Sequence, residues 1–176
     1  MGSGAGGAAA PRVEPTAARS RAWMTSRRVL VLLLVVFVVL GGTGLLGVRD
    51  AVARASGDGC SLEVRYPRVA RAGLDVPLRY SVSCDRPLPA QVVLGVSQDY
   101  ATMFEAQGFA PEPESQSGDG STTWFTVAVE PGSRDLVLDV DTYVQPSSQR
   151  GREAEVVLRL EDREVARTSF RTTLLP

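Results

Sequence analysis

The sequence predicts an all-β fold, an antiparallel β-sandwich of about seven strands, preceded by a single transmembrane helix. One observation is an uncharged apolar run, Val29–Val48, near the N-terminus. The other is a series of short segments after residue 59 in which apolar and polar residues alternate, with Gly, Pro, Ser and Asp between them. Such a pattern is typical of strands that bury one face. The chain then divides into a tail at 1–28, the helix at 29–48, a linker at 49–59 and the sandwich at 60–176.

The apolar run has the length of a membrane span. Its 20 residues would measure about 30 Å as a helix, which is the hydrocarbon thickness of a bilayer. The residues before it include five arginines and one acid, whereas two acids offset the two arginines just behind it. Positive charge is retained in the cytoplasm. We therefore expect a cell-membrane protein with a cytoplasmic N-terminus and an extracellular C-terminal domain. The tail is rich in Gly, Ala, Pro and Arg, and is expected to be disordered.

A cleaved signal peptide is the alternative to an anchor. Val29–Leu40 alone has the length of a signal-peptide core, and Ala51-Val52-Ala53 or Ala53-Arg54-Ala55 could be its cleavage site. The apolar stretch resumes after the glycines, which favours the uncleaved anchor. Translation could also start at Met24, directly before the basic flank Met24–Arg28.

Composition restricts the chemistry that the chain can perform. It contains no Lys, His, Ile or Asn, and all 19 basic residues are Arg, as expected from a GC-rich bacterial genome. Without His there is no Ser-His-Asp or Cys-His catalysis and no histidine metal site. The net charge of −1 gives no reason to expect nucleic-acid binding. We expect no cofactor.

The first two strands are predicted to form a hairpin, and two separate features of the sequence support the same register. Residues alternate in the segments Cys60–Tyr66 and Val76–Cys84, and folding them about Ala72-Gly73 places every apolar residue on one face. The same register sets the two cysteines of the chain, Cys60 and Cys84, opposite each other, and a slip of one residue would lose both features. Outside the cell we expect this pair to be a disulfide. Two buried free thiols are the alternative.

Further strands follow from the same alternation. They are expected at Gln91–Ser97, Thr122–Val129, Leu136–Val144, Glu153–Leu160 and Glu164–Leu174. Counted with the hairpin they make seven, separated by turn residues, which is typical of a sandwich with Greek-key connections.

The segment between the third and fourth strands breaks the pattern. Gln98–Gln107 is expected to form two or three helical turns, with Tyr100, Met103 and Phe104 on one side, and Phe109–Ser121 a flexible acidic loop. Long connections in a compact domain are often functional. Tyr100, Met103, Phe104 and Phe109 therefore form a possible interaction segment. The alternative is that the helix covers an open end of the sandwich and packs its aromatic residues on the core.

The chain resembles the small envelope proteins of high-GC Gram-positive bacteria, and its sandwich is similar to bacterial cell-adhesion-related Ig-like modules. The residues that carry the resemblance are the Cys60/Cys84 strand pair, the stretch Val140–Tyr143 and the final hairpin Val156–Phe170. The resemblance is architectural and implies an Ig-like sandwich that binds or spaces other molecules. It assigns no functional residue.

Asp135, Asp139 and Asp141 are the acidic residues whose spacing comes nearest to that of a functional site. Carboxylates on one strand face can bind Ca²⁺ or perform acid–base work, although such acids are usually a solvated face. We expect a non-catalytic domain that interacts with a protein of the cell envelope or has a structural role there. The alternatives are a secreted binding module for a small ligand or Ca²⁺, and a hydrolase that uses only carboxylates and serine.

Overall fold

The computed structural model describes the chain except residues 1–16, 43–48, 149 and 176. The chain divides into two compact units, Met1–Leu46 and Gly47–Pro176.

The N-terminal unit contains one helix, α1, at Ala17–Gly42. It starts well before Val29, whereas the sequence predicted a disordered tail up to residue 28. Alanine, arginine and methionine are strong helix formers, and residues 17–24 are rich in them. The helix therefore includes these residues on the N-terminal side of the apolar run. The large apolar side chains of Val29–Val39 are 47% to 68% exposed.

Within the described residues, no helix combines the length and the apolar character that crossing a membrane requires. The transmembrane helix predicted at residues 29–48 is therefore not found in the described part of that range. The helix ends at Gly42, and the rest of the run Val29–Val48 belongs to residues 43–48, outside the described part of the chain.

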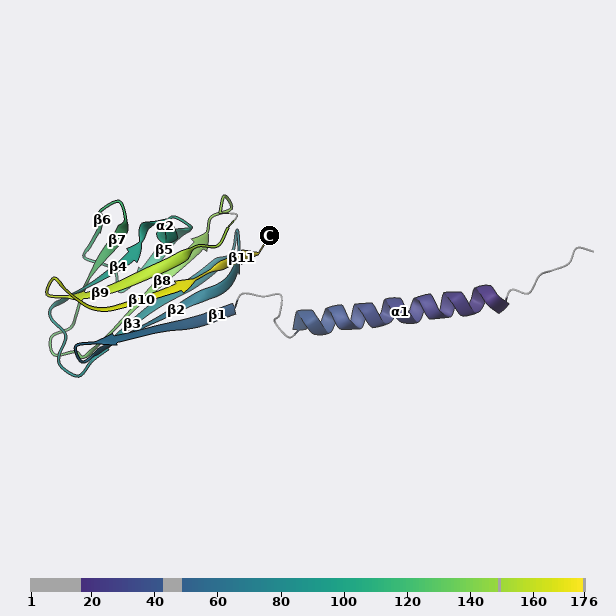
Figure 1. Cartoon of the computed structure of the whole chain (residues 1–176), viewed down its shortest axis with the longest axis horizontal. Coiled ribbons are helices and arrows are strands. Elements are labelled where there is room, and N and C mark those ends of the chain that lie inside the picture. Colours follow the sequence, from purple (N-terminus) through teal and green to yellow (C-terminus); the bar gives the residue numbers. More distant parts are fainter. Residues whose placement is uncertain (1–16, 43–48, 149, 176) are drawn as a thin grey trace, which may run out of the picture. The chain divides into compact units, whose positions relative to one another are not determined.

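The C-terminal unit is a sandwich of two sheets, as predicted (Figure 1). Its elements are β1 (Arg49–Gly57), β2 (Cys60–Arg71), β3 (Asp75–Cys84), β4 (Gln91–Ser97), α2 (Gln98–Ala101), β5 (Phe104–Ala110), β6 (Ser115–Gly118), β7 (Thr122–Ala128), β8 (Asp135–Val144), β9 (Glu153–Leu160), β10 (Arg163–Arg171) and β11 (Thr173–Leu175). One sheet has the order β1-β2-β3-β8-β5, with β11 parallel to β2, and the other has the order β10-β9-β4-β7-β6. All other pairs are antiparallel.

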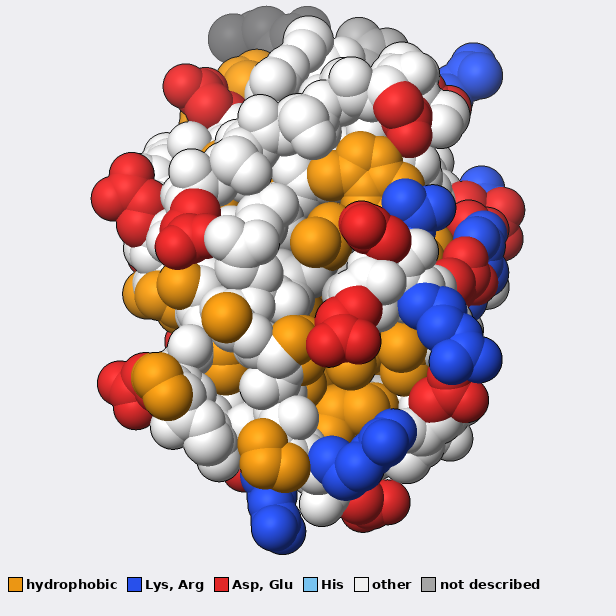
Figure 2. All heavy atoms as spheres, turned by 90° about the vertical axis from the view of Figure 1, so that its left-hand side faces the viewer, with side chains coloured by type: hydrophobic (Ala, Val, Ile, Leu, Met, Phe, Trp, Pro, Cys, Tyr) orange, Lys and Arg blue, Asp and Glu red, His pale blue; other side chains and the backbone are white. Residues whose placement is uncertain are grey.

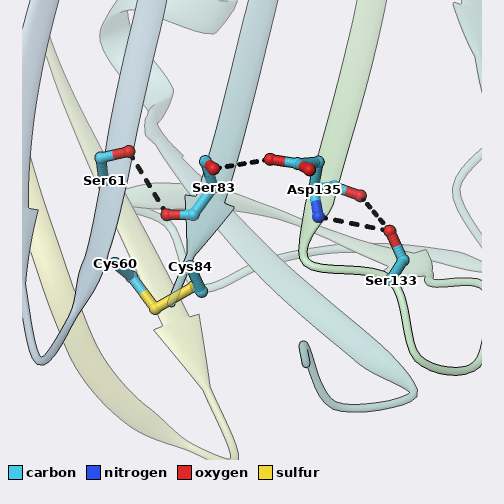
Figure 3. The surroundings of a disulfide bond; sticks show 6 residues. All are labelled: Cys60, Ser61, Ser83, Cys84, Ser133 and Asp135. Carbon is cyan, nitrogen blue, oxygen red and sulfur yellow. Dashed lines mark hydrogen bonds between the residues drawn. A yellow bond between two sulfur atoms is a disulfide. The ribbon is translucent and has the colours of Figure 1, made fainter. Parts of the chain in front are cut away.

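The hairpin of β2 and β3 has the predicted register. Cys60 lies opposite Cys84, and Val64 lies opposite Tyr80. The two cysteines form a disulfide, which confirms the prediction. Beside the disulfide, hydrogen bonds join three strands (Figure 3). Ser61 Oγ donates to the carbonyl of Ser83 at 3.3 Å, and Ser83 Oγ donates to Asp135 Oδ1 at 2.5 Å.

The core lies between the inner faces of the two sheets. Strand alternation directs the apolar side chains there, because successive residues point to opposite faces. The largest fully buried side chains include Leu62, Leu94, Tyr100, Met103, Leu138 and Leu158. Each sheet therefore has one dry face and one face towards solvent.

Two regions differ from the prediction. Residues 49–57 were predicted to be a linker, but they form β1, which pairs with β2 along its whole length. Its small residues, four of nine being Ala or Gly, gave no apolar alternation to detect. Between β4 and β7, the predicted helix is only the single turn α2, and the predicted loop contains β5 and β6. The described part of the chain thus has eleven strands rather than seven.

Candidate functional site: a cleft at the open edge of the sandwich

The two side edges of the sandwich differ. On one side β1 contacts β10 across the sheets, and a Cβ on Gly57 would overlap the carbonyl of Val165. The sheets are closed there by direct backbone contact. On the other side β5 ends one sheet and β6 ends the other. A cleft enters the core between these two strands, and this edge is called the open edge below.

The cleft has a volume of about 240 Å³. Its walls come from both sheets and from α2. The deep part is made of side chains that are less than 10% exposed, namely Leu78, Tyr80, Val96, Tyr100, Phe104, Phe125 and Val140 together with the polar Thr123 and Thr142. The mouth is formed by exposed residues, among them Thr102, Ala106 and Gln116. An apolar group of suitable size would therefore exchange water for a dry, mainly apolar surface on entering.

Three residues of the predicted interaction segment line this cleft. They are Tyr100, Phe104 and Phe109, whereas Met103 is fully buried and lies outside the lining. Tyr100 and Phe104 are also core residues, and only Phe109 among the four is partly exposed. The segment thus forms the inner wall of a cleft rather than an exposed apolar surface.

Tyr100 holds α2 against the core. Its phenol lies 2.9 Å from Oγ1 of Thr172, and Thr172 donates its own hydroxyl proton to the carbonyl of Pro67 at 2.7 Å. The phenol is therefore the donor in its bond to Thr172. The ring makes edge contacts with Phe104 and Phe170 at centroid distances of 5.1 and 5.4 Å. Together these contacts fix one wall of the cleft.

The polar groups of the cleft are neutral. Gln98 accepts a hydrogen bond at Oε1 from Thr123 Oγ1 at 2.7 Å, and Thr142 Oγ1 donates to the carbonyl of Val76 at 2.6 Å. Among the described lining residues, the ionisable groups are the phenols of Tyr80 and Tyr100. Burial raises the pKa of both phenols well above its ordinary value. The cleft therefore offers neither a base nor an acid that titrates near neutral pH.

The chain around the mouth is acidic. Residues 98–121, which include α2, β5 and β6, carry five acids and no arginine. Glu114 accepts a hydrogen bond from Nε2 of Gln91 at 2.7 Å, and Asp99 lies 3.7 Å from the guanidinium of Arg152. Glu105 and Glu112 are exposed. The open edge thus presents an apolar cleft within a negatively charged border.

Asp119 and Trp124 form a second cluster, which the sequence did not indicate. Asp119 accepts hydrogen bonds from Nε1 of Trp124 at 2.9 Å and from the backbone N–H groups of Ser121 and Thr122. These donors, Trp124 first, hold the pKa of Asp119 well below its usual range. The indole lies against Gly95, and the guanidinium carbon of Arg159 is 4.1 Å from its ring centroid. The hydrogen bonds of this cluster stabilise the turn between β6 and β7.

The structure does not bring Asp135, Asp139 and Asp141 together as a calcium site. Asp139 receives two hydrogen bonds from Arg79, the shorter at 2.5 Å, and Asp135 receives that of Ser83. Asp141 lies beside Gly108 of β5. In the described part of the chain, no group of three acidic, Cys or His side chains is placed to hold a metal ion.

A second hollow of about 270 Å³ lies beside the disulfide, at the end of the sandwich where β1 joins β2 and β9 joins β10. Its lining includes Arg86, Leu88, Glu161 and Arg163. Figure 2 views the sandwich from this end and shows hydrophobic side chains between acidic and basic ones. Charged and apolar groups are mixed there, in contrast to the neutral lining at the open edge.

No model of a known protein family matches the sequence. No curated protein matches it either. The chain is similar in structure to a type I cohesin–dockerin complex component from Clostridium thermocellum, with 10% identity, a TM-score of 0.46 and coverage of 67% of this chain and 100% of that chain. It is also similar to the N-terminal domain of the Streptococcus gordonii adhesin Sgo0707, with 14% identity and a TM-score of 0.45. The match covers 69% of this chain and 33% of that chain.

A non-cellulosomal cohesin from Archaeoglobus fulgidus is similar too, with 12% identity, a TM-score of 0.36 and coverage of 61% of this chain and 86% of that chain. These neighbours are β-sandwich domains of cohesins and adhesins. With TM-scores below 0.5, the similarities say nothing about what this chain binds.

Proposed function

We propose that the chain is a membrane-anchored, extracellular, non-catalytic domain that binds a protein partner of the cell envelope through the cleft at the open edge. The cleft carries the proposal, because it is an apolar, largely preformed cavity with a polar mouth. Sites of this kind are where proteins accept ligands or the anchoring side chains of partners.

The size of the cleft favours a protein partner over a free ligand. Pockets for small molecules usually measure about 300–1,000 Å³, and this cleft measures about 240 Å³. An engineered cavity of about 150 Å³ accepts benzene, so the cleft suits one large aromatic or aliphatic side chain. This argues against the alternative of a secreted module that binds a small ligand.

The chemistry of the lining supports a non-catalytic role. General acid–base catalysis needs a group whose pKa is near the working pH. The phenols of Tyr80 and Tyr100 have raised pKa values because they are buried. Gln98, Thr123 and Thr142 can orient a bound group but cannot exchange protons with it at neutral pH.

The sequence supports the anchor and its orientation. The anchor requires the whole uncharged run Val29–Val48 together with the basic flank before it. The exposed apolar side chains of α1 need an apolar surrounding, which a lipid bilayer provides. The arginine-only composition agrees with an envelope protein of a GC-rich bacterium.

Site-specific photo-crosslinking in intact cells tests the proposed binding. A photoreactive amino acid replaces Gln116 at the mouth of the cleft, and in a second variant it replaces Val137, which is exposed on the outer face of β8. We expect a discrete adduct with one protein from position 116 and none from position 137.

A cleft-filling substitution makes the test specific. Ala106→Trp, on the mouth of the cleft, should abolish the adduct from position 116. Ala128→Trp is the matched control, because Ala128 is also an exposed strand alanine but does not line the cleft. An adduct that survives Ala106→Trp, or equal adducts from both probe positions, would contradict the proposal.

A further inference from the structure

The free edge of β5 lies directly beside the cleft. β5 pairs with β8 on one side and is the last strand of its sheet. A terminal strand presents backbone N–H and C=O groups that can pair with another extended chain. Phe104, Ala106 and Phe109 of this strand also line the cleft. A chain added along β5 would therefore run past the mouth of an apolar cavity.

This arrangement suits recognition by strand addition. In that mode, main-chain hydrogen bonds supply affinity, and pockets for alternate side chains supply specificity. A strand places every second side chain on the same face. One apolar side chain of an added strand would then point between the two sheets, where the cleft has room for about one large side chain.

Of the two strands at the open edge, β5 is the better template. It extends over seven residues, Phe104–Ala110. β6 has four residues, Ser115–Gly118, and all of them are exposed and without an apolar side chain. A register shift between Ala106 and Gly108 interrupts β5. Such a bulge limits unspecific pairing along an edge, so an added strand has to match this particular shape.

Charge identifies the chemistry of the partner. Residues 98–121 carry five acids and no basic residue, and Glu105 projects from β5 itself as an exposed side chain. By contrast, β10 at the closed edge carries three arginines and the single acid Glu164, which pairs with Arg167. A basic segment is attracted to the open edge, whereas an acidic segment is repelled from it.

We propose that β5 receives an extended, arginine- or lysine-rich segment of the partner protein as an additional strand, with one apolar side chain of that segment inserted into the cleft between β5 and β6. This inference rests on the proposed function and specifies its partner. A second copy of this chain is a different occupant, and the experiment below separates it.

The test uses the full chain in detergent and synthetic peptides about as long as β5. The probe peptide is capped at both ends and alternates arginine with valine, with one central phenylalanine. Its affinity is measured by calorimetry. Replacing its arginines by glutamates should weaken binding at least about tenfold, since several charge pairs act together, and raised salt should weaken binding of the arginine peptide.

Backbone methylation tests strand addition directly. Two peptides carry N-methyl groups on alternate amides, one on the odd positions and one on the even positions. Only one edge of an added strand pairs with β5. One methylated peptide should therefore lose binding, and the other should bind like the parent. Equal binding of both would overturn the strand-addition proposal, and so would equal binding of the arginine and glutamate peptides.

Variants of the protein complete the test. Glu105→Arg should weaken the arginine peptide and favour the glutamate peptide, and Ala106→Trp should prevent insertion of the phenylalanine. Ala128→Trp should have no effect. Concentration-dependent dimerisation that the peptide does not disrupt would show that a second copy occupies the edge, and would also overturn the proposal. A retained adduct from position 116 with failed peptide binding would overturn only this inference and leave the proposed function standing.

Discussion

At the residue scale, the disulfide links two neighbouring strands covalently. Cys60 and Cys84 face each other across β2 and β3 and are 24 residues apart in sequence. Cys84→Ser should reduce the free energy of unfolding by about 2–5 kcal/mol, because the unfolded chain gains freedom when the loop opens. Cys60→Ser should cost about the same, and the double variant little more, since each removes the same bond.

Chemical denaturation of the three variants measures these costs. Thiol labelling of the denatured, unreduced protein should find no free thiol in the parent. Single variants as stable as the parent would mean that the bond does not stabilise the domain by constraining the unfolded chain.

Gly95 leaves room for the indole of Trp124. A Cβ at this position would lie 2.6 Å from Cε3 of the ring, closer than packed atoms allow. Gly95→Ala should therefore destabilise the domain by about 1–3 kcal/mol, as overpacking usually does. Gly118→Ala is the control, because its nearest neighbour would be 3.7 Å away. In a Trp124→Ala background, Gly95→Ala should cost much less, and an unchanged cost would exclude the ring as the cause.

Asp119 makes the stability of the folded domain depend on pH in the acidic range. Its pKa is lowered in the folded state, mainly by the hydrogen bond from Trp124. Its contribution to stability is therefore complete above the pKa of an unfolded aspartate, about 3.9, and is lost as the pH falls towards the lower folded value. Melting temperatures measured from pH 6 to pH 2 should fall less steeply in Asp119→Asn than in the parent. Parallel curves would show that Asp119 is not responsible.

At the element scale, α2 depends on the bond from Tyr100 to Thr172. Tyr100→Phe keeps the ring contacts and removes the phenol that donates to Oγ1 of Thr172. The free energy of unfolding should fall by about 0.5–1.5 kcal/mol. Thr172 keeps its bond to Pro67, so the loop between β10 and β11 should stay in place. Hydrogen exchange should increase around α2 and not at β2.

The strands that the sequence predicted are those with strict apolar alternation. Gln91–Ser97 and Glu153–Leu160 have the predicted bounds, because each buries one continuous face. β5 was not predicted, because its bulge at Gln107 breaks the alternation of apolar and polar residues. β6 was not predicted either, because Ser115–Gly118 contains no apolar residue to alternate. Pairing with β7, a contact made in three dimensions, determines its conformation.

The cleft was only partly predictable for a similar reason. Tyr100, Phe104 and Phe109 were singled out by their local apolar spacing. Phe125, which lies in the opposite sheet, and Val140, which pairs with Phe109 in the same sheet, belong to β7 and β8, two strands that the sequence predicted. Nothing in the sequence states that the sheets close at β1 and β10 and open at β5 and β6, because that depends on the twist and width of the whole sandwich.

At the scale of the whole molecule, the anchor can be tested by fractionation. With an uncleaved run Val29–Val48, the protein should remain in alkaline-washed membranes at its full mass, and protease added to intact cells should digest the C-terminal domain. A soluble species beginning near Ser56 would show cleavage instead. Digestion of only the N-terminal tail would show the opposite orientation.

β1 contains both of the sequences that could be a signal-peptide cleavage site, Ala51-Val52-Ala53 and Ala53-Arg54-Ala55. The peptide bonds at Ala51–Ala55 belong to a strand that is paired with β2 from Arg49 to Gly57. A peptidase needs an extended, unpaired substrate, so a domain that folds first withholds these bonds from it. A chain that is cut first loses half of β1 and leaves β2 with an open edge, which invites pairing with other chains. Pairing with β2 would thus protect residues 51–55 from a signal peptidase once the sandwich has folded.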